Sequence, residues 1–450
     1  MDSTTSPSFS FLRSLKIGSF NIGSAMVDIL TASVWNRILI TDLGASATPV
    51  SILLGLRYLL APVSVWIGAR SDARPVLGFR RIPYIWLGRL MMLAGIALLP
   101  ISTLRLSSAI DDPAGWLLAL AIFVFYGLGT AVSGGPYLAL IHDSAPPAKR
   151  GVAISIAQTL LILGFAASPI LYARLLPSYS PESFQTLAVL TGVVAGALWF
   201  LSVLGEERRA ASNRDSAVPA ATKLNLRATL RSMWSDRRTR LFFTFLALGA
   251  MSSFAQDAVL EPFGGDVFGL SADATTRFSA FFGSGVLAAM IVTSIVTRRK
   301  RPEEQTRPAT IGLSVMIAGL AALAAAGLSL TAWLITPALI VFGLGFGVYT
   351  VGGVSLLMAM TTEASAGAYL GLWTMTQLVS RGVGIGLGGV VRDIGLALTG
   401  SAAIAYSSVF ILEAIGLAVC IAILSRLDVT GFAREHQVET TPSPMVALAD

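Results

Sequence analysis

The sequence predicts an all-α membrane protein with twelve transmembrane helices in two six-helix bundles. Three observations support this fold class. The 450 residues are 54% hydrophobic and 13% charged, whereas soluble domains average about 25% charged residues. Apolar runs of the ~20 residues that cross a bilayer recur along nearly the whole chain. One long polar stretch, residues 205–240, divides these runs into two sets.

Each apolar run is predicted to be one spanning helix, because most of the runs carry Gly and Ala in place of a polar stripe. The first six are expected at residues 15–40, 49–69, 83–104, 116–141, 151–176 and 187–204. The second six are expected at residues 241–260, 277–296, 309–330, 333–360, 368–391 and 402–424.

These spans imply five consecutive parts of the chain. They are a cytoplasmic tail (1–14), an N-terminal bundle (15–204), a cytoplasmic central loop (205–240), a C-terminal bundle (241–427) and a disordered cytoplasmic tail (428–450).

The formal charge of +7 reflects basic residues concentrated in alternate loops. The loops between them carry acidic residues instead, among them Asp111, Asp266 and Asp273. By the positive-inside rule, both termini and the central loop are cytoplasmic. This distribution over several short loops argues against nucleic-acid binding and for a protein whose immediate surroundings are membrane lipid.

The two halves of the chain share a glycine pattern. Residues 126–129, Tyr-Gly-Leu-Gly, precede a Gly-Gly pair, and residues 342–345, Phe-Gly-Leu-Gly, precede another. Many transporter folds are built from such internal repeats, with a cavity at the interface between them. The glycine runs are interpreted as helix-packing positions, because no strand precedes them and no Lys-Ser/Thr follows, as a phosphate loop would require.

The loop after the second span resembles the cytoplasmic signature of the major facilitator superfamily. The resemblance implies a major facilitator-like fold and a cytoplasmic latch between helix ends. The residues that match the latch are Gly68, Arg70, Asp72, Arg74, Arg80, Arg81, Asp143, Arg150 and Glu363. The second half has only a basic run, residues 298–301, where the loop signature would recur, so its latch is incomplete.

Within that superfamily the chain resembles the PucC and LhaA family, described as bacteriochlorophyll delivery and light-harvesting complex assembly proteins. Four segments carry the resemblance: residues 35–44, 70–85, 256–269 and 388–393. The sequence departs from the family pattern at Trp35 and at Arg57, which adds a charge inside the second span.

The resemblance implies an assembly factor that delivers or shields bacteriochlorophyll or chlorophyll, as cargo, while antenna helices are inserted. The implied partners are the antenna polypeptides, the pigment or its synthase, and lipid. The implied location is the cell inner membrane or the photosynthetic intracytoplasmic membrane. The lipid-facing flank and the region of Asp257 and Glu261 are the expected docking surface.

Asp257 and Glu261 stand at the end of the seventh span, four residues apart, where one helix face would hold both. Pro262 is expected to end or kink that helix. A carboxylate at the bilayer centre is disfavoured by roughly 2.5 to 3.5 kcal/mol, so these acids are expected to face protein or a polar cavity. With Gln256 they form either a ligand or partner site or an ion pair with Arg37, and the ion pair is the preferred interpretation.

A second group of polar residues is expected to line a central cavity. Arg57 and Arg381 lie near mid-span, where each needs a carboxylate, a carbonyl or water. Asp28 is a candidate proton carrier. Gln158 and Gln377 are the amides that we consider for the magnesium of a pigment.

Neither His142 nor His436 is a convincing axial ligand, so no metal site and no nucleotide are expected. No set of catalytic residues is evident in the sequence, and we do not expect an enzyme. The alternative function is a proton-coupled small-solute transporter built on Asp28 and Arg381. A scaffold with a disused cavity is the third interpretation.

Overall fold

The computed structural model describes residues 9–73, 76, 78–146, 149–207, 237–297, 306–359 and 366–427. Within these residues the regular secondary structure is helical, apart from one isolated bridge between Val76 and Phe79. Twelve helical segments in the described part are long and apolar enough to cross a membrane. This confirms the all-α fold class with twelve spans. Most of the central loop and the C-terminal tail lie outside the described residues.

The first six spans are built from eight α-helices and two π-helical turns. They are α1 (Phe11–Gly18), α2 (Phe20–Ile29), the π turns Leu30–Trp35 and Ile38–Asp42, α3 (Ala47–Leu59), α4 (Ala61–Ala73), α5 (Ile82–Ser108), α6 (Pro113–Asp143), α7 (Arg150–Leu175) and α8 (Pro181–Val203).

The second six spans contain further short helices. They are α10 (Arg237–Phe254), a 3₁₀ turn (Ala255–Ala258), α11 (Leu260–Phe268), α12 (Ala272–Thr276), α13 (Phe278–Thr297), α14 (Thr306–Ser329), a 3₁₀ turn (Ala332–Leu334), α15 (Ile335–Ala359), α16 (Ala366–Thr399) and α17 (Ala402–Leu424).

Local sequence sets several helix starts. Asp112 accepts a hydrogen bond from the N–H of Ala114 at the start of α6, and Pro113 occupies the first helical position. Ser180 caps α8 in the same way, again followed by a proline, and Ser401 caps α17. These side chains satisfy backbone N–H groups that have no partner inside the helix.

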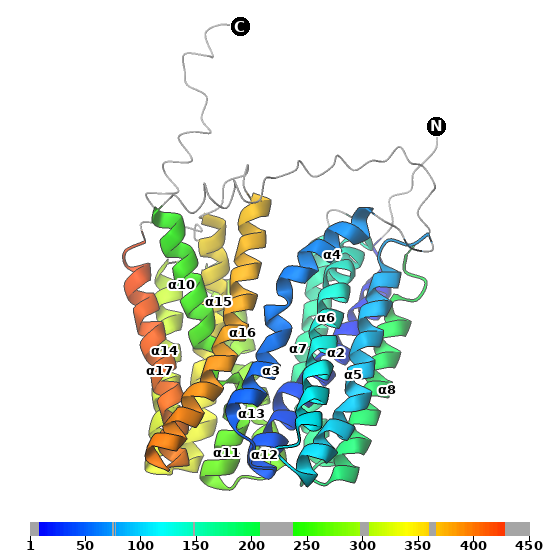
Figure 1. Ribbon diagram of the computed structural model, residues 1–450. Coiled ribbons are helices and arrows are strands. Elements are labelled where there is room, and N and C mark those ends of the chain that lie inside the picture. The colour runs from blue at the N-terminus through cyan, green and yellow to red at the C-terminus, as the bar shows by residue number, and fades with distance from the viewer. Residues whose placement is uncertain are drawn as a thin grey trace, which may run out of the picture.

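Each half of the chain has its own buried apolar cluster. Residues from α1 to α8 make up nearly all of one cluster, and residues from α10 to α17 form the other. Figure 1 shows the two groups of helices as separate bundles. The repeated glycines permit close packing in both. A Cβ on Gly88 would lie 2.4 Å from the oxygen of Gly129, and one on Gly345 would lie 2.8 Å from the oxygen of Gly312.

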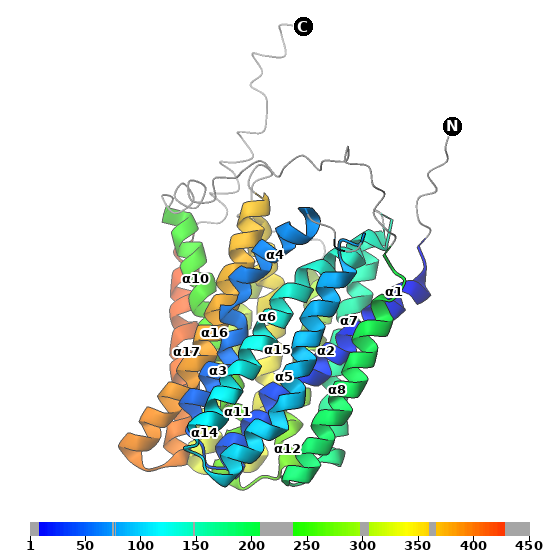
Figure 2. The ribbon, with the colours of Figure 1, turned by 45° about the vertical axis from the view of Figure 1, so that its right-hand side comes forward.

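The two bundles contact each other mainly through five helices. Helix α3 packs along α16, as Figures 1 and 2 both show, and α7 packs against α12 and α13. We name the two ends of the molecule the α4 end and the α11 end, after the helices that lie there (Figure 1).

Hydrogen bonds between the bundles strengthen the contact near the α11 end. Asp393 of α16 accepts the N–H groups of Ala47 and Thr48, at 3.0 and 2.7 Å, and so caps α3 from the other bundle. Asn36 donates to the carbonyl of Ala258 at 2.8 Å. These contacts join the bundles on one side of a central space that both line.

Candidate functional site

A cavity of about 480 Å³ lies between the two bundles. Its walls come from α2, α3 and α7 on one side and from α10, α11, α13, α15 and α16 on the other. The volume lies in the range of small-molecule sites, roughly 300 to 1,000 Å³. Most lining residues are apolar, and charged residues from both bundles are set among them.

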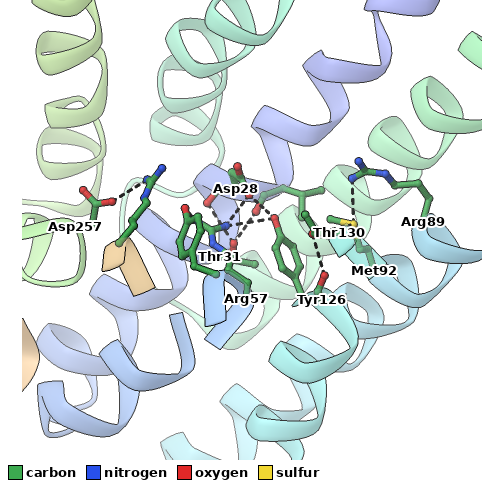
Figure 3. A network of polar contacts seen from close by, with 11 residues as sticks. Asp28, Thr31, Arg57, Arg89, Met92, Tyr126, Thr130 and Asp257 are labelled. Carbon is green, nitrogen blue, oxygen red and sulfur yellow. Dashed lines mark hydrogen bonds and ion pairs between the residues drawn. The ribbon is translucent and has the colours of Figure 1, made fainter. Parts of the chain in front are cut away.

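Two ion pairs line the cavity, one from each bundle. Arg57 of α3 lies 2.7 Å from the carboxylate of Asp28, and Arg381 of α16 lies 2.9 Å from that of Asp257. Tyr126 donates a short hydrogen bond to Asp28. Figure 3 shows these contacts as part of one row of polar groups that has Asp257 at one end and Arg89 at the other. Each arginine therefore has the carboxylate that its position inside a membrane span requires.

Tyr58 connects the two ion pairs across the cavity. The guanidinium of Arg381 lies 4.5 Å from the centre of the Tyr58 ring, and that of Arg57 lies 4.6 Å from it. Arg57 also donates to the Tyr58 hydroxyl at 2.7 Å. Since Arg381 and Tyr58 belong to different bundles, this cation–π contact is a charged link between them.

Asp28 and Arg381 line the same cavity, as expected, but each forms its ion pair within its own bundle.

The acidic segment does not form one regular helix. Helix α10 ends at Phe254, a 3₁₀ turn follows, and α11 begins at Leu260. Pro262 stands in the first turn of α11, where its missing N–H has no cost. The break lies directly before Pro262, which cannot donate to the carbonyl of Ala258, and so agrees with the expectation that this proline ends or kinks the helix.

Glu413 of α17 supports this helix break. Its carboxylate accepts the N–H of Gln256 at 2.7 Å, and the side chain is 2% exposed. A break inside a membrane leaves backbone N–H groups without partners, and a carboxylate from a neighbouring helix satisfies one of them. Sequence analysis did not predict this role for Glu413.

Asp257 and Glu261 both line the cavity, and Glu261 is 4% exposed. Glu261 accepts a hydrogen bond from the hydroxyl of Ser279 at 3.2 Å. The expectation that these acids form an outer docking surface with the lipid-facing flank is therefore wrong, since both face the space between the bundles.

The predicted pairing of Arg37 with these acids is also wrong. Arg37 lies 2.7 Å from the carboxylate of Asp42 and donates to the carbonyl of Leu270 at 3.1 Å. The reason is local, because residues five apart meet on one face where a helix has π turns. Such turns occupy Leu30–Trp35 and Ile38–Asp42.

The two candidate amides do not line the cavity. Gln158 is exposed on α7, and Gln377 is partly buried on α16. The position of a residue along a span does not determine which face of the helix it occupies.

Part of the predicted latch is present at the α4 end. Arg81 lies 3.6 Å from Asp143, and Arg70 stacks over Trp66. Gly68 lies within α4, and Arg150 begins α7. Arg74, Glu363 and the side chain of Asp72 lie outside the described residues.

Two acids that sequence analysis did not identify add to the contacts at this end. Glu207 accepts the N–H groups of Arg80, Arg81 and Ile82, at 2.6 to 3.0 Å, and so caps α5. Glu206 accepts from Arg13 and Lys16 at 2.6 and 2.7 Å. Burial alone would raise the pKa of Glu206, but the hydrogen bonds from Lys16 and Arg13 outweigh it and lower this pKa. The sequence feature that could have indicated these two acids is the Glu-Glu pair itself, which stands at the end of the sixth span and before a basic loop.

Comparison with known proteins gives consistent results for the family and the fold. Residues 34–432 match the family model described as PUCC protein. Protein PucC of Rhodobacter capsulatus is 28% identical over 424 residues, which cover 91% of each chain. The "Bacteriochlorophyll synthase 44.5 kDa chain" of Rhodobacter capsulatus is 28% identical over 393 residues, covering 85% of this chain and 88% of that protein.

Solved transporters share the fold. A bacterial homologue of the human lysosomal transporter Spinster, inward-facing and occupied, superposes with a TM-score of 0.69 at 14% identity, covering 96% of this chain and 98% of that one. A POT family transporter in complex with 5-aminolevulinic acid gives 0.66 at 13% identity, covering 92% and 96%. These similarities confirm the major facilitator-like fold.

Proposed function

Because this chain belongs to the PUCC protein family, we propose that it is a membrane assembly factor for photosynthetic light-harvesting antenna complexes. In this role it delivers or shields bacteriochlorophyll or chlorophyll while antenna helices insert, and it is not an enzyme. The observation that carries the proposal is the family match over residues 34–432, together with relatives named PucC and bacteriochlorophyll synthase chain.

The proposed docking surface for antenna helices is the lipid-facing side of the bundles. Large apolar side chains on α13 are more than half exposed, namely Ile291, Val292, Ile295 and Val296. In a bilayer such a face contacts either lipid tails or another transmembrane helix. In this proposal the pigment is the cargo, and its synthase is a further partner.

The proposed location is the cell inner membrane or the photosynthetic intracytoplasmic membrane, with both termini cytoplasmic. In that orientation the α4 end faces the cytoplasm. Arg70, Arg80 and Arg81 lie at this end, whereas Asp266 and Asp273 lie near the α11 end, which fits the positive-inside rule.

We expect the protein to co-purify with antenna polypeptides and pigment. The full chain is purified in mild detergent from cells that make antenna, and its absorption spectrum and bound polypeptides are determined. The matched control is the same purification from cells that lack the antenna polypeptides but still make pigment. A pigment-free and polypeptide-free protein from antenna-making cells contradicts the proposal.

The second candidate function is a proton-coupled small-solute transporter. The observation that favours it is the cavity, which carries acids from both bundles. We expect Asp28→Asn to abolish solute uptake by reconstituted vesicles if Asp28 carries the proton. The control is Asp112→Asn, which removes an acid that caps α6 away from the cavity. Uptake that survives Asp28→Asn, or that is lost equally in the control, argues against this function.

A further inference from the structure

Among the described residues that line the cavity, Glu261 is the acid without an arginine partner. Asp28 and Asp257 each have one, at 2.7 and 2.9 Å. Glu261 is 4% exposed, and the hydroxyl of Ser279 donates to its carboxylate at 3.2 Å. Hydrogen bonds from neutral hydroxyls do not offset the loss of hydration of a buried carboxylate. The site therefore lacks a positive charge.

The two arginines do not supply that charge. Arg381 is held by Asp257 and lies between aromatic rings, 4.0 Å from the centre of Phe254 and 4.5 Å from that of Tyr58. Arg57 is held by Asp28 and by the Tyr58 hydroxyl. Each guanidinium thus already has its counter-ion.

Beside Glu261, two further acceptor oxygens have no hydrogen-bond donor. The amide nitrogen of Gln256 donates to the carbonyl of Ser253 at 3.0 Å and to Asp257 at 3.3 Å. Both partners are acceptors, so they fix which end of the amide is nitrogen. The Oε1 of Gln256 is left without a donor, and so is the Oε2 of Glu413 behind it. Of these two residues Gln256 lines the cavity, so a ligand that carries a hydrogen-bond donor could satisfy its Oε1.

The cavity wall also carries aromatic rings from α13 and α15. Phe282 of α13, one helical turn beyond Ser279, stacks on Phe342 with ring centres 5.3 Å apart and lies 5.7 Å from Phe346. All three rings line the cavity. Such rings bind apolar groups and attract cations through their faces.

We propose that the cavity binds an amphipathic organic cation, whose ammonium group donates to Glu261 and whose apolar part packs against Phe282 and Phe346. This site is distinct from the proposed docking of antenna helices on the lipid-facing side. It concerns equilibrium binding only and does not require that the ligand cross the bilayer.

The test compares a cation with its neutral analogue. The cation is protonated tryptamine and the neutral analogue is tryptophol. Both have an indole ring and an ethyl chain, which ends in an ammonium group in the first and in a hydroxyl group in the second. Binding of each to the purified full chain is measured by titration calorimetry at neutral pH. We expect the cation to bind at least about tenfold more tightly than the alcohol, since a charge-assisted hydrogen bond is about twice as strong as a neutral one.

Three variants test whether Glu261 is responsible for the preference for the cation. Glu261→Gln is expected to abolish it, and Glu261→Asp, which keeps the charge, is expected to retain a preference for the cation. The matched control is Asp273→Asn, which removes the same charge from an exposed ion pair with Arg277 outside the cavity. It should bind as the wild type does.

Equal binding of the two compounds by the wild-type protein overturns the proposal, as does binding of neither. An undiminished preference in Glu261→Gln overturns it as well. If Glu261→Gln does not fold, the wild-type comparison and Glu261→Asp still decide the question. Failure here leaves the antenna proposal standing, because co-purification with pigment is measured without this ligand.

Discussion

Replacing Arg57 with methionine is expected to lower the free energy of unfolding by about 2 to 3 kcal/mol. The change keeps much of the side-chain volume but leaves Asp28 without its counter-ion. Loss of one partner from a fully buried ion pair costs roughly 3 to 5 kcal/mol. The Asp28 side chain is 31% exposed, so water in the cavity reduces the penalty.

A double-mutant cycle distinguishes the loss of the ion pair from the loss of packing around Arg57. It uses Arg57→Met, Asp28→Asn and the variant that carries both changes. The double variant Asp28→Asn, Arg57→Met removes both charges, and we expect it to recover most of the stability lost in Arg57→Met. Unfolding of the purified protein in a detergent titration measures the three variants against the wild type. If the two single changes add up in the double variant, the ion pair does not account for the loss.

Replacing Gly55 with alanine is expected to loosen the contact between the bundles and to cost about 1 to 3 kcal/mol, the usual range for overpacking. A Cβ on Gly55 of α3 would lie 2.4 Å from the carbonyl oxygen of Gly382 on α16. The Cβ is fixed by the backbone of α3 and the oxygen belongs to the backbone of α16, so a rotamer change does not relieve the clash. The helices must move apart, and with them the two bundles.

The matched control for Gly55→Ala is Gly134→Ala. Gly134 also lies in a transmembrane helix, α6, but its Cβ would meet no atom within 4 Å. There the change is expected to stabilise the helix by up to about 1 kcal/mol, because alanine has the higher helix propensity. Comparing the two unfolding free energies isolates the contact between bundles. If both variants are equally stable, this contact does not hold the bundles together.

Sequence analysis predicted the spans better than the ends of the spans and the breaks in them. The hydropathy pattern predicted all twelve, because hydrocarbon requires a long apolar helix at each crossing. Pro262 indicated an interruption between α10 and α11, but no sequence feature showed which residue supports it. That break depends on Glu413, which lies more than 150 residues further along the chain and accepts the N–H of Gln256.

Membership of the PUCC family was also readable from the chain, since residues 256–269 and three other segments carried the resemblance before the family match over 34–432 confirmed it. The ion-pair partners of those same residues could not be predicted from the sequence. Asp257 binds Arg381 rather than Arg37, and Arg37 binds Asp42. An ion pair depends on helix rotation and on local π turns, which hydropathy does not report.

The sequence by itself therefore determined that this protein crosses the membrane twelve times in two similar halves, because bilayer thickness and the demand for internal hydrogen bonds act on every span separately. Only the tertiary structure decided which polar groups meet. The residues that form the cavity come from α2, α7, α11, α13 and α16, among other helices, and the packing of the two bundles gives arginines to Asp28 and Asp257 but leaves Glu261 with a serine hydroxyl.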